Sequence, residues 1–461
     1  MITTVIRRVV PVLCLAGVVL GLVRKQAVPA LGSDGYFHLR MGQEFLSGDW
    51  SIRAPGHFSE FDTAAWLPTQ WASQLLMAGA HDLAGMAGFI WVTGTMLLAV
   101  PVALYLGSRA AGASPLPAAV SMGLALLAMS SGLSARPQVL SYVLITVFTV
   151  AWLRTAHDRR PRYWLVLLNW VWVPVHGMWF IGILIGAVTV LGMLIEAPRE
   201  YRKLAPLAAI PAGSALIAMA TPLGWEVYGT IGAVGSRARI LTEWQPTDFT
   251  QAPALVLVAM AAVVLLVGLR RQAMTWPELL LLGLAVAWGL YTNRTVDVAA
   301  AMLAAPLAIA LERLSPAGIA LTRRESAVVG LAAVIGALAL WPVANLRADR
   351  ESEPKWINDR LGAMPGGTKV LNDWELGHDL LYRQPHIQLV MHGYLDVFTP
   401  DEIDRNTDIA GLEPGWDDEV EELDVDYALV RKDSPLGYAL GKDDWTEVEG
   451  DKTYVLLTPP D

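Results

Sequence analysis

Cysteine is almost absent from this 461-residue chain, which contains only Cys14. One cysteine can form neither an intramolecular disulfide nor a Cys-x-x-Cys metal site. Charged residues are scarce too, at 17% of the chain, whereas soluble domains contain about a quarter. Because 54% of the residues are hydrophobic, the apolar surface is too large for one water-soluble core. A lipid bilayer is the solvent that fits this composition.

Motifs of several soluble enzyme classes are also missing. The chain has no GxGxxG after a strand, no GxxxxGK[ST], no HExxH and no GxSxG. His378 and His386 do not have the helical spacing of zinc ligands. The sequence therefore gives no support to a soluble nucleotide-binding, zinc-protease or serine-hydrolase function.

Long apolar runs bounded by charged residues, glycine or proline are what the chain does have. They lie near 9–23, 88–107, 116–133, 138–153, 163–175, 177–195, 205–221, 253–269, 276–291, 297–311 and 326–343. Several of them are shorter than the ~20 residues that an upright span needs. These runs predict an α-helical polytopic membrane protein with about eleven transmembrane helices.

The loop charges predict the orientation of these helices. With the N-terminus in the cytoplasm, the loops on that side hold 15 Lys and Arg residues and the opposite loops hold eight. Positive residues favour the cytoplasmic side, so we expect an inner (plasma) membrane protein with its C-terminus outside the cell. The first run also resembles a signal peptide, with Arg7 and Arg8 before it and small residues at 27–30. An uncleaved anchor is the favoured interpretation, and cleavage would leave the later spans unchanged.

Two domains are predicted. Residues 1–343 form the transmembrane domain, including a first outer loop at 24–87. Residues 344–461 carry 27 acidic and 11 basic side chains, a net charge of −16, while the preceding part carries +7. Such an acidic domain repels nucleic acid. Short β-like segments at 368–371, 388–392, 427–431 and 453–457, with a helix beginning near 402, predict an extracytoplasmic α/β domain.

Unusual polar residues fall in the loops predicted to be outside. They are Asp34, His38, Trp71, Arg136, His176, Glu243, Trp244 and Arg294. Each has an ordinary alternative, such as a solvated loop acid, a helix-end histidine or an arginine that contacts lipid headgroups. Polar groups near a bilayer usually face a cavity or a partner, so the set as a whole predicts one outward-facing site.

This set suits group transfer from a phosphate-linked donor. A carboxylate such as Asp34 can accept the proton of an acceptor hydroxyl. Arg136 and Arg294 can hold a phosphate through bidentate hydrogen bonds, and His176 can donate to the same phosphate. His38, Trp71, Glu243 and Trp244 are expected to contact the substrate, with the tryptophans packing on sugar rings or an isoprenoid chain.

The layout resembles the GT-C class of membrane glycosyltransferases, in which a large first outer loop carries an acidic residue near its start. It is similar, more narrowly, to a group of poorly characterised bacterial GT-C-like proteins. The matching stretches are Asp-Gly-Tyr-Phe-His-Leu-Arg-Met-Gly at 34–42, Ala-Arg-Pro-Gln at 135–138, Val-His-Gly at 175–177, Glu-Trp-Gln-Pro-Thr-Asp-Phe at 243–249 and Asn-Asp-Trp-Glu-Leu-Gly at 372–377.

The resemblance implies an inverting transferase that moves a hexose or pentose from a polyprenyl phosphate to a glycan, lipid or protein acceptor, with Asp34 as the catalytic acid residue. Two motifs depart from the group's pattern. Gln70-Trp71-Ala72 replaces Glu-Trp-Leu, and His392-Gly393-Tyr394 replaces Asp-Gly-Arg. A second loop carboxylate and an Asp-x-Asp motif are therefore missing. We expect no metal cofactor, although a divalent ion remains an alternative.

Two other functions fit parts of the sequence. A transporter or flippase of lipid-linked glycans would explain the many spans, but transporters usually show related halves and mid-membrane charges. A non-catalytic envelope assembly factor would explain the missing loop carboxylate and the acidic tail. The clustering of polar residues at one face favours the glycosyltransferase.

Overall fold

The computed structural model describes residues 16, 17, 21, 34–232, 244–348 and 354–460. The predicted first run at 9–23 and Glu243 thus fall largely or wholly outside the described residues. The chain divides into two compact units, each described here by itself. The first comprises residues 1–28, 69–73 and 83–348, and the second comprises residues 29–68, 74–82 and 349–461.

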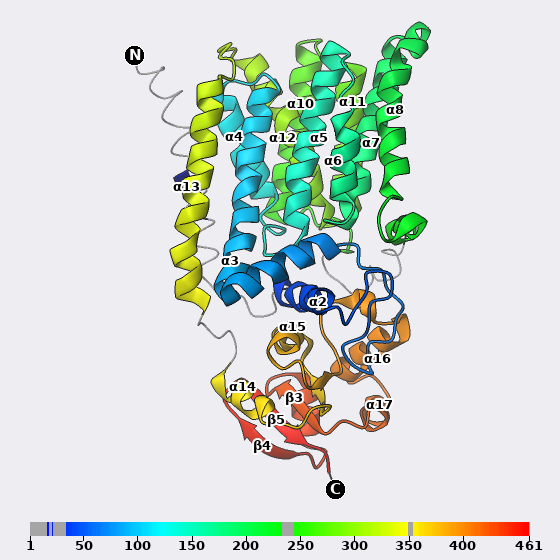
Figure 1. The fold of residues 1–461 in the computed structure, drawn as a ribbon, viewed down its shortest axis with the longest axis vertical. Coiled ribbons are helices and arrows are strands. Elements are labelled where there is room, and N and C mark those ends of the chain that lie inside the picture. The colour runs from blue at the N-terminus through cyan, green and yellow to red at the C-terminus, as the bar shows by residue number, and fades with distance from the viewer. Residues whose placement is uncertain (1–15, 18–20, 22–33, 233–243, 349–353, 461) are drawn as a thin grey trace. The chain divides into compact units, whose positions relative to one another are not determined.

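The first unit is a bundle of helices (Figure 1). In chain order they are α3 (Trp71–Ala110), α4 (Pro115–Ala128), α5 (Gln138–Asp158), α6 (Trp164–Trp172), η1 (Gly177–Trp179), α7 (Phe180–Glu196), η2 (Pro198–Glu200), α8 (Tyr201–Ala218), η3 (Gly224–Tyr228), α9 (Gly229–Gly232), α10 (Ala252–Arg270), α11 (Trp276–Tyr291), α12 (Thr295–Leu314) and α13 (Arg323–Ala348). Each apolar run predicted from 88–107 onward coincides with one of these helices.

Six helical segments among the described residues are long and apolar enough to cross a membrane. They are Trp71–Ala110, Gln138–Asp158, Gly177–Glu196, Ala252–Arg270, Thr295–Leu314 and Arg323–Ala348. Helices α4 and α11 are apolar but have 14 and 16 residues, about 21 and 24 Å at 1.5 Å per residue. The protein is therefore a multi-pass membrane protein by helix composition, and the number eleven stays a prediction.

Helix α3 is two helices joined at a sharp backbone break. Ala84 and Gly85 leave helical geometry, and Gly85 has a φ of 60°. Glycine adopts this left-handed region without the steric cost that a Cβ imposes. The break lies at the boundary between the units, because residues 74–82 group with the second unit and residues from Leu83 onward with the first.

Helix α12 is the centre of the bundle and packs against α4, α5, α10 and α11. Seven of its buried residues are alanines, including Ala300, Ala304 and Ala308. Small side chains allow neighbouring helices to approach closely, which is how helices associate in a bilayer. Helix α13 is the opposite case, because only 17% of its apolar window is buried inside the structure.

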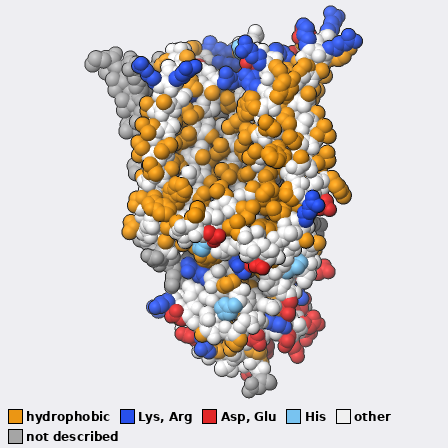
Figure 2. Space-filling view, viewed as in Figure 1, with side chains coloured by type: hydrophobic (Ala, Val, Ile, Leu, Met, Phe, Trp, Pro, Cys, Tyr) orange, Lys and Arg blue, Asp and Glu red, His pale blue; other side chains and the backbone are white. Residues whose placement is uncertain are grey.

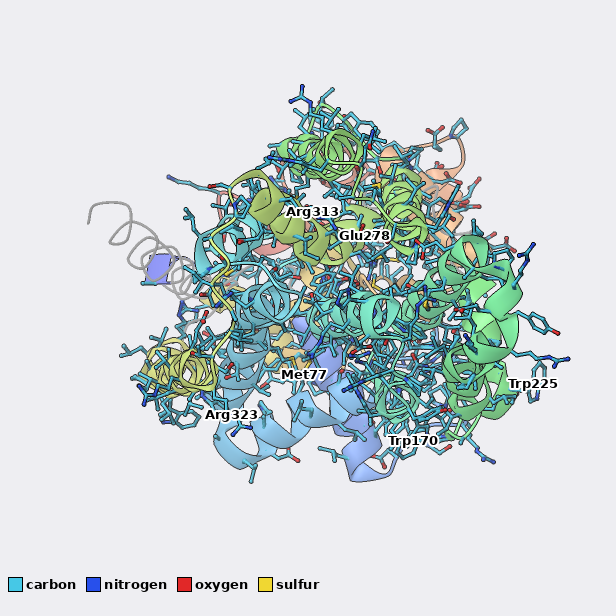
Figure 3. The ribbon with its side chains drawn as sticks, turned by 90° about the horizontal axis from the view of Figure 1, so that it is seen from above. Met77, Trp170, Trp225, Glu278, Arg313 and Arg323 are labelled. Atoms are coloured by element: carbon cyan, nitrogen blue, oxygen red, sulfur yellow. The ribbon has the colours of Figure 1, made fainter. Side chains whose placement is uncertain are left out.

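Positive side chains gather at one end of the bundle, while hydrophobic side chains cover its flank (Figure 2). Ion pairs join helices at this end. The Arg109 guanidinium binds Glu325 at 2.6 Å, and Arg313 binds Glu278 at 2.7 Å (Figure 3). This is the end that the loop charges assign to the cytoplasm.

The second unit contains a five-stranded mixed sheet with the order β2-β1-β3-β5-β4. Its elements are α2 (Gly35–Ser47), α14 (Lys355–Gly362), β1 (Lys369–Asn372), α15 (Trp374–Arg383), β2 (Gln388–Leu389), η6 (Leu395–Val397), α16 (Pro400–Gly411), α17 (Trp416–Glu422), β3 (Tyr427–Arg431), α18 (Pro435–Leu440), β4 (Thr446–Gly450) and β5 (Tyr454–Thr458). Strand β1 pairs in parallel with β2 and β3, and β5 pairs antiparallel with β3 and β4.

The four strands expected from sequence coincide with β1, β2, β3 and β5, and the expected helix near 402 is α16. Strand β4 was not expected. Its residues Thr446–Gly450 are mostly exposed and include two glutamates, so it lacks the alternating apolar pattern on which strand prediction depends. It forms by pairing with β5 at the edge of the sheet.

The first loop contributes to the core of this unit. Phe61, which is 5% exposed, packs in one cluster with Leu371, Val390 and Ile409. The backbone N–H of Ala64 donates to the carbonyl of Val397 at 2.9 Å. Residues 29–68 therefore group with the C-terminal residues, whereas the sequence analysis placed loop 24–87 in the transmembrane domain.

Candidate functional site

Asp34 directly precedes α2 in the second unit and occupies the N-cap position, although its carboxylate makes no capping hydrogen bond. Its Oδ1 atom lies 3.7 Å from Nδ1 of His378, with the two side chains 18% and 10% exposed. Helix α2 packs against α15, which carries His378. The carboxylate thus stays accessible to a ligand while it faces an imidazole.

The Asn-Asp-Trp-Glu-Leu-Gly motif at 372–377 positions His378. Asn372 fixes the end of β1 by donating to the carbonyl of Met391 at 2.8 Å and accepting from its N–H. Asp373 caps α15 by accepting from the N–H of Glu375 at 3.1 Å. A Cβ on Gly377 would clash with His392, and one on Gly393 would clash with the His378 ring. Both glycines are therefore required for α15 to lie this close to residues 391–393.

His38 is buried in the same unit, at 3% exposure. Its Nδ1 atom is 3.2 Å from Nε2 of Gln74, and its ring contacts the rings of Phe37 and Tyr394. His38 was predicted to contact substrate. Its burial among these neighbours is what the structure shows, and the substrate contact stays a prediction.

Asp62 is fully buried, whereas a loop aspartate usually faces water. Its carboxylate accepts from the N–H groups of Phe58 at 3.0 Å and Ser59 at 2.8 Å. Nε2 of His392 lies 3.7 Å from Oδ2 of Asp62. His392, which stands where the resembling group has Asp, thus belongs to a buried pair rather than to an exposed acidic site.

In the first unit, Arg294 is held by neighbours from two loops. Its Nη2 atom donates to Oε1 of Gln138 at 3.0 Å, and its guanidinium lies over the Trp244 ring, 4.9 Å from the ring centre. The segment after Trp244 is bonded to the same turn, because the N–H of Asn293 donates to the carbonyl of Gln245 at 3.0 Å. The Glu-Trp-Gln-Pro motif, of which Glu243 lies outside the described residues, thus meets Arg294.

A buried carboxylate that sequence analysis did not select completes this group. Asp297, in the first turn of α12, is 2% exposed and accepts from the hydroxyl of Tyr142 at 3.1 Å. Arg136 stands two residues before Gln138, the partner of Arg294. We call Arg136, Arg294, Asp297, Tyr142 and Gln138 the arginine cluster.

His176 lies near this cluster, in the turn between α6 and η1. Its Nδ1 atom accepts from the N–H of Met178 at 3.3 Å, which leaves Nε2 as the protonated nitrogen. Burial, together with the charge of Arg294, lowers the pKa of His176 to about 3. Trp71 stands directly before two residues that hold this turn. The N–H of Ala72 donates to the carbonyl of Pro174, and the hydroxyl of Ser73 donates to the carbonyl of Val175.

The predicted site residues thus fall into two groups. Arg136, His176, Trp244 and Arg294 lie together in the first unit, and Asp34 and His38 lie in the second. Sequence reasoning missed Asp297 and His378. An aspartate inside an otherwise apolar helix is a signal for Asp297, whereas nothing local to His378 links it to a residue 344 positions earlier.

Among the described residues, no group of three or more His, Cys, Asp or Glu side chains has the arrangement of a metal site.

No protein-family model matches the chain, and no curated protein matches it. Solved structures do share its fold. ArnT from Cupriavidus metallidurans, bound to undecaprenyl phosphate, has a TM-score of 0.53 and 16% identity, over 98% of this chain and 99% of that chain. AglB from Archaeoglobus fulgidus, in complex with an inhibitory peptide and a dolichol-phosphate, has a TM-score of 0.51 and 13% identity, over 92% and 70%.

A second structure of the Archaeoglobus fulgidus oligosaccharyltransferase, tethered to an acceptor peptide, has a TM-score of 0.52 and 14% identity, over 93% and 70%. Both neighbours are membrane glycosyltransferases of the GT-C class. At these identities the likeness concerns the fold, and the resemblance predicted from the order of the sequence motifs is confirmed at that level. The chain has the fold of the GT-C membrane glycosyltransferases.

Proposed function

We propose that the protein is a membrane glycosyltransferase that moves a sugar from a polyprenyl phosphate to an acceptor in the cell envelope. The observation that carries the proposal is the fold match over the whole length of ArnT, whose solved structure holds undecaprenyl phosphate. The AglB structure holds a dolichol-phosphate. Two neighbours with polyprenyl-type phosphates support a donor of the same chemical class here, while the sugar and the acceptor stay open.

Asp34 is the proposed general base. Its carboxylate takes the proton of the acceptor hydroxyl while the hydroxyl oxygen bonds to the anomeric carbon of the donor sugar. The bond from that carbon to the lipid phosphate breaks, and the phosphate leaves with its electron pair. Attack on the side opposite the leaving phosphate inverts the anomeric configuration. Partial exposure of Asp34 beside His378 supports this role.

The arginine cluster is the proposed binding site for the donor phosphate. Two arginines from different segments belong to it, and arginine pairs with phosphate through two parallel hydrogen bonds. His176 is neutral at physiological pH and carries a proton on Nε2, so it serves as an uncharged donor. Trp71 and Trp244 are the proposed contacts for sugar or lipid. Metal independence belongs to the proposal and rests on the missing Asp-x-Asp motif, so activity should survive EDTA.

The outer face of the inner membrane is the proposed location of the reaction, in line with the loop charges. A reporter that is active only in the cytoplasm, fused after Asp461, is expected to be inactive.

Asp34→Asn tests the catalytic assignment, because it keeps the shape of the side chain and removes its basicity. We expect a rate loss of about 10²–10⁴, the usual contribution of a general base, with the protein still folded. Asp49→Asn is the matched control, since Asp49 is exposed and its carboxylate bonds to Ser47 on the same loop. Profiling of envelope glycans in the mutant cells provides the readout. Normal glycans in Asp34→Asn cells would exclude Asp34 as the base.

A further inference from the structure

A wide-open pocket of about 580 Å³, called the cavity below, lies within the second unit, apart from the residues given roles above. It is lined by Arg40, Gln43, Asn358, Tyr382, Arg383, Gln384 and Pro385. Two guanidinium groups, three amides and a phenol line it, and no carboxylate does. Its size is within the range of cavities that hold small-molecule ligands, roughly 300–1,000 Å³.

The two arginines of the cavity differ in their ion pairs. Arg40 forms an ion pair with Glu44, one helical turn further along α2. Arg383 is half-buried and has no ion-pair partner among the described residues. An arginine removed from water without a counter-charge is costly, and an anionic ligand offsets that cost. The cavity therefore favours a negatively charged ligand.

The remaining lining groups favour a ligand with hydroxyl groups. The Gln384 amide is oriented by Asn358, because its Nε2 atom donates to the Asn358 carbonyl at 3.2 Å. The hydroxyl of Tyr382 lies 2.8 Å from Nε2 of His81, and Nδ1 of His81 lies 3.5 Å from the Gln43 amide. Side chains held in this way present fixed donors and acceptors, and a sugar ring stacks well beside a tyrosine.

The cavity lies beside the same two helices as the proposed base Asp34, α2 and α15. Asp34 faces His378, and the rings of Tyr36 and Tyr382 stack with centres 5.6 Å apart. The two helices therefore run in the same direction, with the cavity one to two turns further on. Arg40 is six residues beyond Asp34, about 9 Å along a helix axis. A sugar bound in the cavity is therefore as far from Asp34 as one monosaccharide of a glycan chain is from the next.

We propose that this cavity binds an acidic sugar of the acceptor, that is, a hexose that carries a carboxylate or a phosphate. The identification of this ligand as the acceptor rests on the proposed function, while the binding itself does not. Arg383 pairs with the charged group, and Gln43, Gln384 and Tyr382 contact the hydroxyls. The donor phosphate has its proposed site in the arginine cluster, so the two charged groups are recognised by different residues.

Calorimetric titration of the full-length protein in nanodiscs tests the proposal without any donor. The probes are glucuronate, glucose 6-phosphate, glucose and inorganic phosphate. At least one charged sugar is expected to bind about tenfold or more tightly than glucose, since a hydrogen bond to a charged group contributes about 1.5–3 kcal/mol. The tighter of the two identifies the charged group as carboxylate or phosphate.

Variants assign the binding to the cavity. Arg383→Gln should lower the affinity for the charged sugar about tenfold or more, and Arg383→Lys should lower it less. Gln43→Glu places a negative charge in the wall and should also weaken binding, which keeps the test decisive if Arg383→Gln does not fold. Arg360→Gln is the control, because Arg360 is exposed on α14 and does not line the cavity.

Equal binding of glucose and the charged sugars would overturn the proposal, as would wild-type affinity in a folded Arg383→Gln variant. Inorganic phosphate that binds as tightly as glucose 6-phosphate would overturn the sugar assignment. Asp34→Asn should bind the probes normally. If Asp34→Asn loses transfer but the wild-type protein binds no probe, the cavity proposal alone is refuted. If the wild-type protein binds the probes but Asp34→Asn cells make normal glycans, the proposed function alone is refuted.

Discussion

The Oδ1 atom of Asp34 lies 3.7 Å from the Nδ1 atom of His378, across the contact between α2 and α15. The pair joins the start of the first loop to the C-terminal residues within one unit. This separation is longer than a hydrogen bond but allows an electrostatic contact between the imidazole and the carboxylate. His378 is therefore a positioning residue for the proposed base.

His378→Ala should lower kcat about 10- to 100-fold and leave KM for the donor nearly unchanged, because positioning of a catalytic group affects the transition state more than donor binding. His378→Asn, which keeps a hydrogen-bonding group near Asp34, should restore part of the rate. Steady-state kinetics of the purified variants provide the measurement, with His386→Ala as the control. A residue that only supports the fold would show no rescue by asparagine.

Arg294→Lys keeps the positive charge but removes the planar guanidinium that bonds Gln138 and lies over Trp244. Donor binding should weaken by about 1–3 kcal/mol, measured as the affinity for a polyprenyl-phosphate analogue. Arg270→Lys, at the exposed C-terminal end of α10, serves as the control. Equal affinity in the two variants would mean that Arg294 does not bind the donor phosphate.

The sequence predicted the elements whose signal is local. Apolar runs such as 253–269 and 326–343 become helices because hydrophobic length alone specifies a membrane helix, and strands such as 427–431 have the β-branched, apolar pattern of a buried strand. Contacts between distant segments were not predictable in this way. Phe61 packs in a core with residues more than 300 positions later, and no local pattern in the sequence indicates this contact.

The residues of the candidate site also divide into those with a local signal in the sequence and those without one. Arg136, His176 and Arg294 were found because polar residues in short loops between apolar runs are unusual. A loop aspartate usually faces water, and nothing in the sequence indicates that the backbone N–H groups of Phe58 and Ser59 bind Asp62 inside the protein. His378 and Arg383 acquire their significance only when α15 packs on α2.

The buried Asp62 carboxylate should stabilise the second unit. Asp62→Asn replaces one of the two acceptor oxygens by an NH₂ group, so one of the two backbone N–H groups loses its acceptor. We expect the free energy of unfolding to fall by about 1–3 kcal/mol, measured by thermal or denaturant unfolding of the purified protein. Asp49→Asn should leave stability nearly unchanged. Asp62 is thus unsuitable as a neutral control for Asp34.

His176 should make the stability of the first unit depend on pH. Its pKa is lowered from 6.5 to about 3, by burial and by the charge of Arg294. The unfolded chain therefore binds a proton below pH 6.5 that the folded chain does not, so stability is full above pH 6.5 and falls as the pH is lowered towards 3. The slope for one such group is at most about 1.4 kcal/mol per pH unit.

His176→Asn removes the titrating ring and keeps an acceptor for the N–H of Met178. Its unfolding temperature should fall less than that of the wild type between pH 7.5 and pH 5, a window above the usual range of carboxylates. His157→Asn is the control, because His157 is exposed at the end of α5 and should keep the wild-type slope. Parallel curves for His176→Asn and the wild type would mean that His176 is charged in the folded protein, and its proposed role as a neutral donor to the phosphate would then be wrong.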